Sequence, residues 1–246
     1  MKRFNWQIFL GVSLVLLSAL FYYVHYVIFR DAHHIFIYLI GDIAFVFIEV
    51  LLVTLIIHQL LSEREKRAMF EKLNIVIGAF FSEVGTTLLK SLTDFDQDID
   101  RTSKDILMLK DWSGRGFSRL KNRILKYDCK IDTQKGDLEG LIHFLNEKRN
   151  FLLRLLENQN LIEHESFTNL LWAIFHLDDE LSSRKDLTEL PQADYIHISG
   201  DIKRAYIHLI QAWLDYMKHM NTNYPYLFSL AMRMNPFDPN ASPEVK

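Results

Sequence analysis

Two long apolar runs near the N-terminus limit what this chain can fold into. The first covers residues 8–29 and carries no charge, and the second covers residues 35–61 and carries only Asp42 and Glu49. At about 1.5 Å per helical residue, each run is long enough to cross a hydrocarbon core of about 30 Å. Because only residues 30–34 separate them, we expect a tight transmembrane helical hairpin.

The charge distribution supports a division at this point of the chain. The 246 residues include 28 Lys and Arg and 31 Asp and Glu, for a net charge of −3, yet residues 1–61 hold only six of these charged side chains. So small a net charge argues against bulk nucleic-acid binding, and we expect no nucleic-acid partner. A single cysteine, Cys129, excludes an internal disulfide and fits a reducing compartment.

A cleaved signal peptide is the alternative to an anchor, because Lys2 and Arg3 form a basic start. We favour the anchor for two reasons. The first apolar run is longer than the apolar region of a signal peptide, and bulky Phe21, Tyr22 and Tyr23 occupy the place where small residues would permit cleavage.

Basic residues predict the orientation of the hairpin. The connecting turn contains one, Arg30. The segments before the first apolar run and after the second contain five, namely Lys2, Arg3, Arg64, Lys66 and Arg67. Basic residues gather on the cytoplasmic side of membrane proteins. We therefore expect a multi-pass protein of the inner (cytoplasmic) membrane, with both termini in the cytoplasm and the turn outside.

Asp42 and Glu49 are unusual for a membrane span. Their spacing of seven residues puts them on nearly the same helix face, about 10 Å apart along the axis. In one interpretation, a protonated carboxyl donates a hydrogen bond between helices and specifies assembly. In the other, several copies surround an axis, and rings of the two carboxylates line a cation or proton path. We favour the first interpretation.

Helical periodicity dominates the rest of the chain. A charged exit at residues 63–67 leads into apolar positions spaced three or four apart as far as residue 92, read as one helix or as two with a break near Gly78 or Gly85. Further helices are expected over residues 103–112, 117–127, 137–158, 164–184, 193–220 and 225–233.

These patterns predict an all-α fold, with an N-terminal transmembrane helical hairpin followed by a cytoplasmic helical bundle. The expected organisation is a hairpin at 1–61, a membrane-exit connector at 62–93, a cytoplasmic helical domain at 94–233 and a proline-containing tail at 234–246.

Three segments resemble a prokaryotic family of two-span integral membrane proteins with a helical cytoplasmic domain. They are Ile40-Gly41-Asp42-Ile43-Ala44-Phe45, Glu63-Arg64-Glu65-Lys66, and the closing run Tyr224-Pro225-Tyr226-Leu227-Phe228-Ser229-Leu230-Ala231 with Asn235-Pro236-Phe237-Asp238-Pro239. The resemblance covers the whole chain and implies the two-span layout. It transfers no activity and no functional residue.

An acidic connection offers a calcium-binding pattern. Oxygen-bearing residues fall at the spacing of EF-hand ligands, and the acids among them are Asp94, Asp96, Asp98, Asp100 and Asp105. Ile99 replaces the glycine that the sharp turn needs, and position 12 is Asp rather than Glu. We favour an acidic linker in which Thr102 caps the next helix and Asp105 completes a capping box. We therefore expect no cofactor, with Ca²⁺ as the alternative.

Histidines precede acids by four residues in three places, His143/Glu147, His176/Glu180 and His197/Asp201. This spacing puts both side chains on one helix face, as in helical di-iron proteins. Because the pairs lie beside or opposite the apolar stripes, we favour a solvated face or a polar subunit contact over metal binding.

A basic, partly apolar segment follows the acidic one. Phe117, Leu120, Ile124 and Tyr127 interleave with basic residues at helical spacing, and the basic residues of interest are Arg115, Arg119, Lys121, Arg123 and Lys126. Near a membrane, such a helix can bind anionic lipid head groups. The favoured alternative is a basic face that pairs with acids of the same domain.

No zinc spacing, phosphate loop or nucleophile elbow occurs, so we expect no enzyme and no catalytic residue. The leading hypothesis is a membrane-anchored homo-oligomeric assembly or scaffold protein. The alternative is an oligomeric cation or proton channel lined by Asp42 and Glu49. The expected partners are the lipid bilayer and further copies of the chain.

Overall fold

The computed structural model describes residues 2–109, 112, 114–158, 161, 164–187 and 189–245, with backbone alone at 2–5, 7 and 66–71. The chain divides into two compact units, Met1–Lys66 and Arg67–Lys246, called here the N-terminal unit and the helical domain. The elements are α1 (Lys2–Phe29), α2 (Ala32–Phe80), the π-helix η1 (Phe81–Gly85), α3 (Thr86–Thr93), α4 (Ile99–Leu107), α5 (Arg115–Leu125), α6 (Leu138–Leu156), α8 (Glu165–Ser182), α9 (Gln192–Asn223) and α10 (Pro225–Arg233).

The expected all-α fold is confirmed for the part of the chain that the structure describes. Within that part, helices account for all the regular structure, and one isolated bridge joins Asp96 to Ile131.

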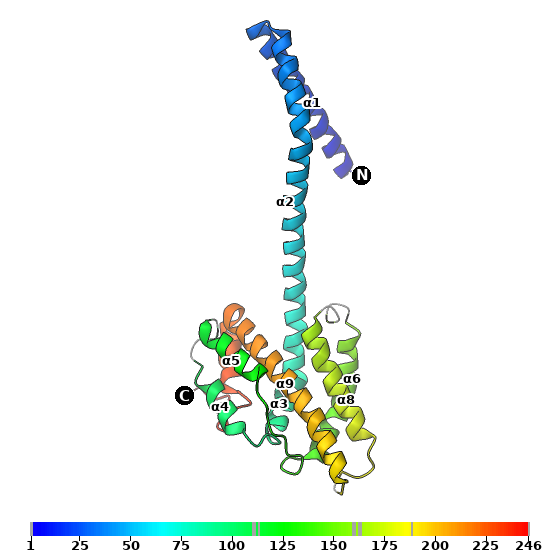
Figure 1. Cartoon of the computed structure of the whole chain (residues 1–246), viewed down its shortest axis with the longest axis vertical. Helices are drawn as coiled ribbons and strands as arrows, with labels where there is room; N and C mark the ends of the chain where they lie inside the picture. Colours follow the sequence, from blue (N-terminus) through cyan, green and yellow to red (C-terminus); the bar gives the residue numbers. More distant parts are fainter. Residues whose placement is uncertain are drawn as a thin grey trace. The chain divides into compact units, whose positions relative to one another are not determined.

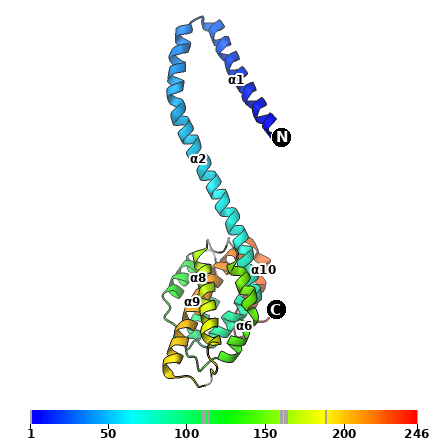
Figure 2. The same cartoon turned by 90° about the vertical axis from the view of Figure 1, so that its right-hand side faces the viewer.

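A short turn joins α1 to α2 in the N-terminal unit, whose colour runs from blue into cyan in Figures 1 and 2. Arg30 adopts the left-handed backbone region with φ of 49°, and the Asp31 carboxylate accepts hydrogen bonds from the backbone N–H groups of His33 and His34. A side chain that satisfies the free N–H groups of a first helical turn is an N-cap. The cap starts α2 at Ala32, so the turn is shorter than the expected 30–34.

Helix α9 is the central element of the helical domain. It packs against α8, α10, α5, α3 and η1, and α6 lies against α8. Helices α6, α8 and α9 are labelled in both Figure 1 and Figure 2. Its inward face carries a buried stripe that includes Ile198, Ile202, Leu209 and Trp213. The apolar stripes of the amphipathic helices therefore meet in one core, and the expected helical bundle is confirmed.

A π-helix interrupts the helical path between α2 and α3, near the break expected at Gly85. The backbone N–H of Thr86 donates to the Phe81 carbonyl five residues earlier, as in a π-helix, and the Thr86 hydroxyl donates to the same carbonyl at 2.8 Å. A Cβ on Gly85 would lie 2.6 Å from the Phe81 ring and 2.7 Å from the Phe80 ring. Glycine thus lets both buried rings pack against the backbone.

One local expectation is wrong. Helix α4 starts at Ile99 rather than near residue 103, so Thr102 lies inside the helix and is buried instead of capping it. The closing tail is also partly buried, because Asn235 and Phe237 enter the core and the Phe237 ring lies 5.3 Å from that of Trp213. Residues 110 and 111, which end the expected 103–112 helix, lie outside the described residues.

Candidate functional sites

Three helical stretches of the described chain are long and apolar enough to cross a membrane: Ile8–Phe29, Ala32–Glu65 and Lys72–Thr93. The first two contain no buried residues in their most apolar windows, whereas 44% of that window is buried in the third. The third stretch therefore belongs to the core of the helical domain. The first two leave their apolar side chains uncovered by the chain.

Asp42 and Glu49 lie on the exposed surface of α2. Within the described residues, the structure gives neither carboxylate a hydrogen bond or an ion pair. Among the described residues, hydroxyl side chains of α1 do not bond either carboxylate. Ser13 instead bonds the carbonyl of Leu10 in its own helix. The N-terminal unit alone does not satisfy the two carboxylates.

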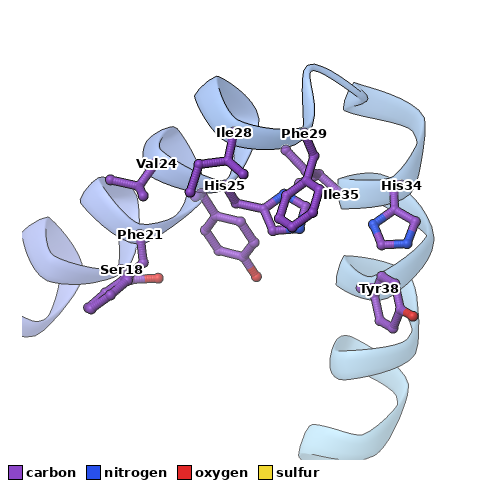
Figure 3. Close-up of a pocket in the computed structure, with 10 residues that line it drawn as sticks. Ser18, Phe21, Val24, His25, Ile28, Phe29, His34, Ile35 and Tyr38 are labelled. Carbon is purple, nitrogen blue, oxygen red and sulfur yellow. The ribbon is translucent and has the colours of Figure 1, made fainter.

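A cleft of about 750 Å³ lies between α1 and α2 near their turn. Figure 3 shows His25 and Phe29 of α1 between the two helices, with His34 and Tyr38 on α2. The rings of His25 and His34 are nearly parallel with centroids 5.8 Å apart, and Nδ1 of His25 is buried without a hydrogen-bond partner among the described residues. The lining is otherwise mainly aliphatic and aromatic.

The acidic connection does not form a calcium loop. Asp94, Asp98 and Asp100 are exposed, but Asp96 is completely buried, and Asp105 lies within α4 and pairs with Arg123. The five side chains therefore point to different surroundings. An EF-hand loop needs its ligands to converge on one point.

Asp96 instead belongs to a buried polar cluster. The Tyr127 hydroxyl donates to its carboxylate at 2.8 and 3.0 Å, and the backbone N–H of Asp98 also donates to it. Burial raises the pKa of Asp96, and these hydrogen bonds oppose the shift. Burial, with the nearby Asp96 charge, raises the pKa of the Cys129 thiol to about 12, so this thiol is unreactive at neutral pH.

Four of the five basic residues lie in α5, and Lys126 follows it as the C-cap residue. Acids of the helical domain pair with two of the five. Lys121 contacts Asp215 of α9 at 2.6 Å, and Arg123 contacts Asp105 of α4. Arg115, Arg119 and Lys126 are exposed. The pairing agrees with a basic face directed partly at acids of the same domain.

Two of the three histidine–acid pairs meet across α8 and α9. His176 and Glu180 lie one turn apart on α8, His197 and Asp201 one turn apart on α9, and one donor atom from each lies within 4.8 Å of all the others. We call these four residues the α8–α9 cluster. The third pair, on α6, does not join it: His143 and Glu147 are exposed, and Glu147 pairs with Lys148.

Asp201 is the buried member of the α8–α9 cluster. Its side chain is 2% exposed, whereas those of His176 and His197 are 46% and 52% exposed. Nε2 of His176 lies 3.4 Å from Oδ1 of Asp201, and Nε2 of His197 lies 3.3 Å from Oδ2. Nε2 of His197 is also 3.5 Å from Oε2 of Glu180.

Two arginines flank the cluster. Arg204 donates to Oδ1 of Asp201 at 2.9 Å, and Arg184 donates to Oε2 of Glu180 at 2.9 Å. The Arg184 hydrogen bond lowers the pKa of Glu180, because it favours the ionised carboxylate. Oδ2 of Asp201 is buried and has no hydrogen-bond partner among the described residues.

The sequence shows the spacing within each histidine–acid pair but not that two pairs face each other. Helical periodicity predicts a solvated face of α9, and Asp201 departs from it because α8 covers that position. One weak signal in the sequence separates these two pairs from the pair on α6. His176/Glu180 lies near the end of α8 and His197/Asp201 near the start of α9, and a short connection brings those two helix ends together.

Comparison with known proteins places both parts of the chain in one family. The family model described as "MJ1433, N-terminal helical domain" matches residues 2–61, and "Uncharacterized protein MJ1433, C-terminal helical domain" matches residues 69–233. Uncharacterized protein MJ1433 of Methanocaldococcus jannaschii is 46% identical over 235 residues, covering 95% of this chain and 94% of the relative. No solved structure matches. With both of its parts matched and nearly half of its residues shared with that relative, the chain belongs to the MJ1433 family of helical proteins.

Proposed function

We propose that the chain is anchored in the inner membrane by its N-terminal unit and assembles there as a homo-oligomer that presents the helical domain to the cytoplasm. The support comes from the uncovered apolar stretches Ile8–Phe29 and Ala32–Glu65. Soluble monomers rarely expose apolar patches beyond a few hundred square ångströms, and lipid covers such a surface without cost. The family to which the chain belongs is compatible with this role and assigns no activity.

The observation that carries the oligomer is the exposure of Asp42 and Glu49. A carboxyl at membrane depth is costly, and such groups nearly always face other helices or a water-filled cavity. Neither is partnered within the described residues of its own chain, and both lie on nearly the same face of α2. A second copy packed on this face supplies the missing partners, and Gly41 next to Asp42 lets helices approach closely.

Replacing Glu49 tests the assembly. We expect wild-type protein extracted in mild detergent to be oligomeric by native mass spectrometry, and Glu49→Gln to keep that mass because the amide retains a hydrogen-bond donor and acceptor. Glu49→Leu removes both and is expected to shift most of the population to smaller species. The matched control is Phe47→Leu, at similar depth on another face and 74% exposed, which is expected to leave the mass unchanged.

A strictly monomeric wild type at every detergent and protein concentration would contradict the proposal. Equal masses for wild type and Glu49→Leu, with Phe47→Leu also unchanged, would leave an oligomer but remove Glu49 from its interface.

A cation or proton channel is the second candidate, favoured by the recurrence of two carboxylates on one face of α2. In a ring of copies, that face lines the axis and the carboxylates attract cations. Under this candidate, Glu49→Gln leaves the mass unchanged and suppresses flux through reconstituted vesicles. Absence of flux from an intact wild-type oligomer, across several cations and pH values, would exclude the channel and leave the scaffold.

A further inference from the structure

We propose that the α8–α9 cluster binds one divalent first-row transition-metal ion through His176, Glu180, His197 and Asp201. The inference concerns the helical domain alone and does not depend on membrane insertion or on oligomer formation. It assigns to the domain a ligand that joins two of its helices.

The spacing of the donor atoms fits a single metal ion. Zinc binds imidazole nitrogen and carboxylate oxygen at about 2.0–2.2 Å in tetrahedral geometry, so neighbouring ligand atoms are roughly 3.3–3.6 Å apart. Nε2 of His197 lies 3.3 Å from Oδ2 of Asp201 and 3.5 Å from Oε2 of Glu180, while Nε2 of His176 lies 3.4 Å from the other oxygen of Asp201, Oδ1. One donor atom from each of the four residues lies within 4.8 Å of all the others. Each helix contributes its two donors from successive turns of one face, so the backbone already presents all four toward one point.

Asp201 supplies an independent observation that points to a ligand. Its Oδ2 atom is buried and accepts no hydrogen bond from the described residues, although Nε2 of His197 lies 3.3 Å away, while Arg204 donates to Oδ1. A buried carboxylate oxygen left without a partner costs free energy. A cation at Oδ2 removes this cost, and Arg204 then orients the carboxylate from the outer shell, as partners of metal ligands commonly do.

The donor set limits the class of metal. Two imidazole nitrogens and two carboxylate oxygens suit Zn²⁺ and neighbouring ions such as Co²⁺, Mn²⁺ and Fe²⁺. Calcium and magnesium prefer sites made entirely of oxygen ligands. The two histidines are about half exposed, so an ion can enter from solvent while Asp201 anchors it at the buried end.

The competing explanation is an ion-pair network that needs no metal. Arg204 and Arg184 carry two positive charges against the two carboxylates, and Arg184 already contacts Glu180. Such a network explains why Asp201 is tolerated in the interior. Protonated imidazoles of His176 and His197 would extend this network, because both lie within ion-pair distance of the carboxylates. The network leaves one observation unexplained, namely that the buried Oδ2 of Asp201 accepts no hydrogen bond from the described residues.

Zinc binding by the full-length protein in detergent tests the proposal. The protein is purified without a histidine tag, stripped with a chelator and titrated with Zn²⁺ against a chromogenic competitor, and Co²⁺ is added separately to record its visible spectrum. We expect one Zn²⁺ per chain and the intense visible absorption of four-coordinate Co²⁺. His176→Gln and His197→Gln are each expected to weaken Zn²⁺ binding at least about 10-fold, since loss of even outer-shell partners has effects of this size.

The α6 pair supplies the matched control. His143→Gln removes a histidine with the same spacing to an acid, outside the cluster, and is expected to leave Zn²⁺ affinity within about 2-fold of wild type. Circular dichroism checks that each variant is folded. His176 and His197 are half exposed, so we expect their replacement to preserve the fold.

Three outcomes would overturn the proposal: no saturable one-to-one Zn²⁺ binding by wild type, equal weakening by His143→Gln, or wild-type affinity in the His176→Gln/His197→Gln double variant. The first, accompanied by a folded wild type, would assign the cluster to the ion-pair network.

Discussion

Asp96 shows how one buried side chain makes the stability of the helical domain depend on pH. It is completely buried and accepts hydrogen bonds from Tyr127, yet burial still raises its pKa above the ordinary value for aspartate. The folded protein therefore holds this proton more tightly than the unfolded chain does. Stability from this group is highest below the unfolded pKa of about 3.9 and is lost as pH rises through the raised folded value.

The asparagine variant removes this titration. We expect the difference in free energy of unfolding, wild type minus Asp96→Asn, to increase as pH is lowered from neutral toward about 4. Denaturant unfolding followed by tryptophan fluorescence measures it in full-length protein.

Asp94→Asn is the control, because this neighbouring carboxylate is exposed and its replacement should leave the pH profile close to wild type. A pH-independent difference for Asp96→Asn would show that Asp96 does not titrate differently in the folded state.

For single residues, the sequence shows where the polar side chains lie along the chain but does not predict which of them are buried. Asp96 and Asp94 are equivalent in an alternating acidic pattern. The structure shows that Asp96, whose backbone forms a bridge with Ile131 and whose carboxylate accepts from Tyr127, is the buried one. In the same way, Asp201 lies on a polar face by periodicity and is buried by α8. Contacts between segments distant in sequence decide both cases.

At the scale of the elements, regular periodicity predicts helices well. Helix α10 has the expected bounds of 225–233, and α6, α8 and α9 differ from their expected bounds by three residues or fewer. The predicted start of α4 is wrong because the N-cap residue of this helix is Asp98 and not Thr102. The capping-box pattern of Thr102 and Asp105 therefore falls inside the helix, where Thr102 is buried.

Two glycines in helices are expected to respond oppositely to alanine. Gly85→Ala forces a Cβ against the buried rings of Phe80 and Phe81, so we expect it to lower the free energy of unfolding by about 1–3 kcal/mol. Gly200→Ala meets no atom within 4 Å on α9, so we expect an increase of roughly 0.5–1 kcal/mol.

Denaturant unfolding of both variants in parallel measures whether each one lowers or raises the free energy of unfolding. Stabilisation by Gly85→Ala would mean that the π-helix does not require glycine, and destabilisation by Gly200→Ala would mean that α9 is more crowded there than the structure indicates.

For the whole molecule, the sequence predicts a boundary near residue 61, and the structure divides at Lys66. The two apolar runs make that boundary visible because charged residues are nearly absent before it. The meeting of α8 and α9 at one polar cluster could not be predicted, because periodicity describes each helix alone and does not give the rotation of one against another.

Cysteine labelling tests the proposed topology. Cys129 is buried and its pKa is about 12, so the wild-type chain should react little with maleimides. We expect Ala32→Cys, exposed at the turn, to be labelled by a membrane-impermeant maleimide in intact cells.

Glu63→Cys, exposed beyond the second apolar run, is expected to react only after the membrane is permeabilised. The reverse pattern would invert the orientation derived from the basic residues, and labelling of both in intact cells would argue against membrane insertion of this segment.

The burial of Phe237 against Trp213 has a consequence for biosynthesis. A ribosome makes Phe237 after every other member of the core, so the helical domain cannot complete its packing until nearly all of the described chain has been synthesised. The apolar stretches Ile8–Phe29 and Ala32–Glu65 are synthesised before that contact forms, so the membrane anchoring proposed above would begin while the core of the helical domain is still open. Translation thus separates the two events in time, and a nascent chain stalled before residue 237 keeps its core open.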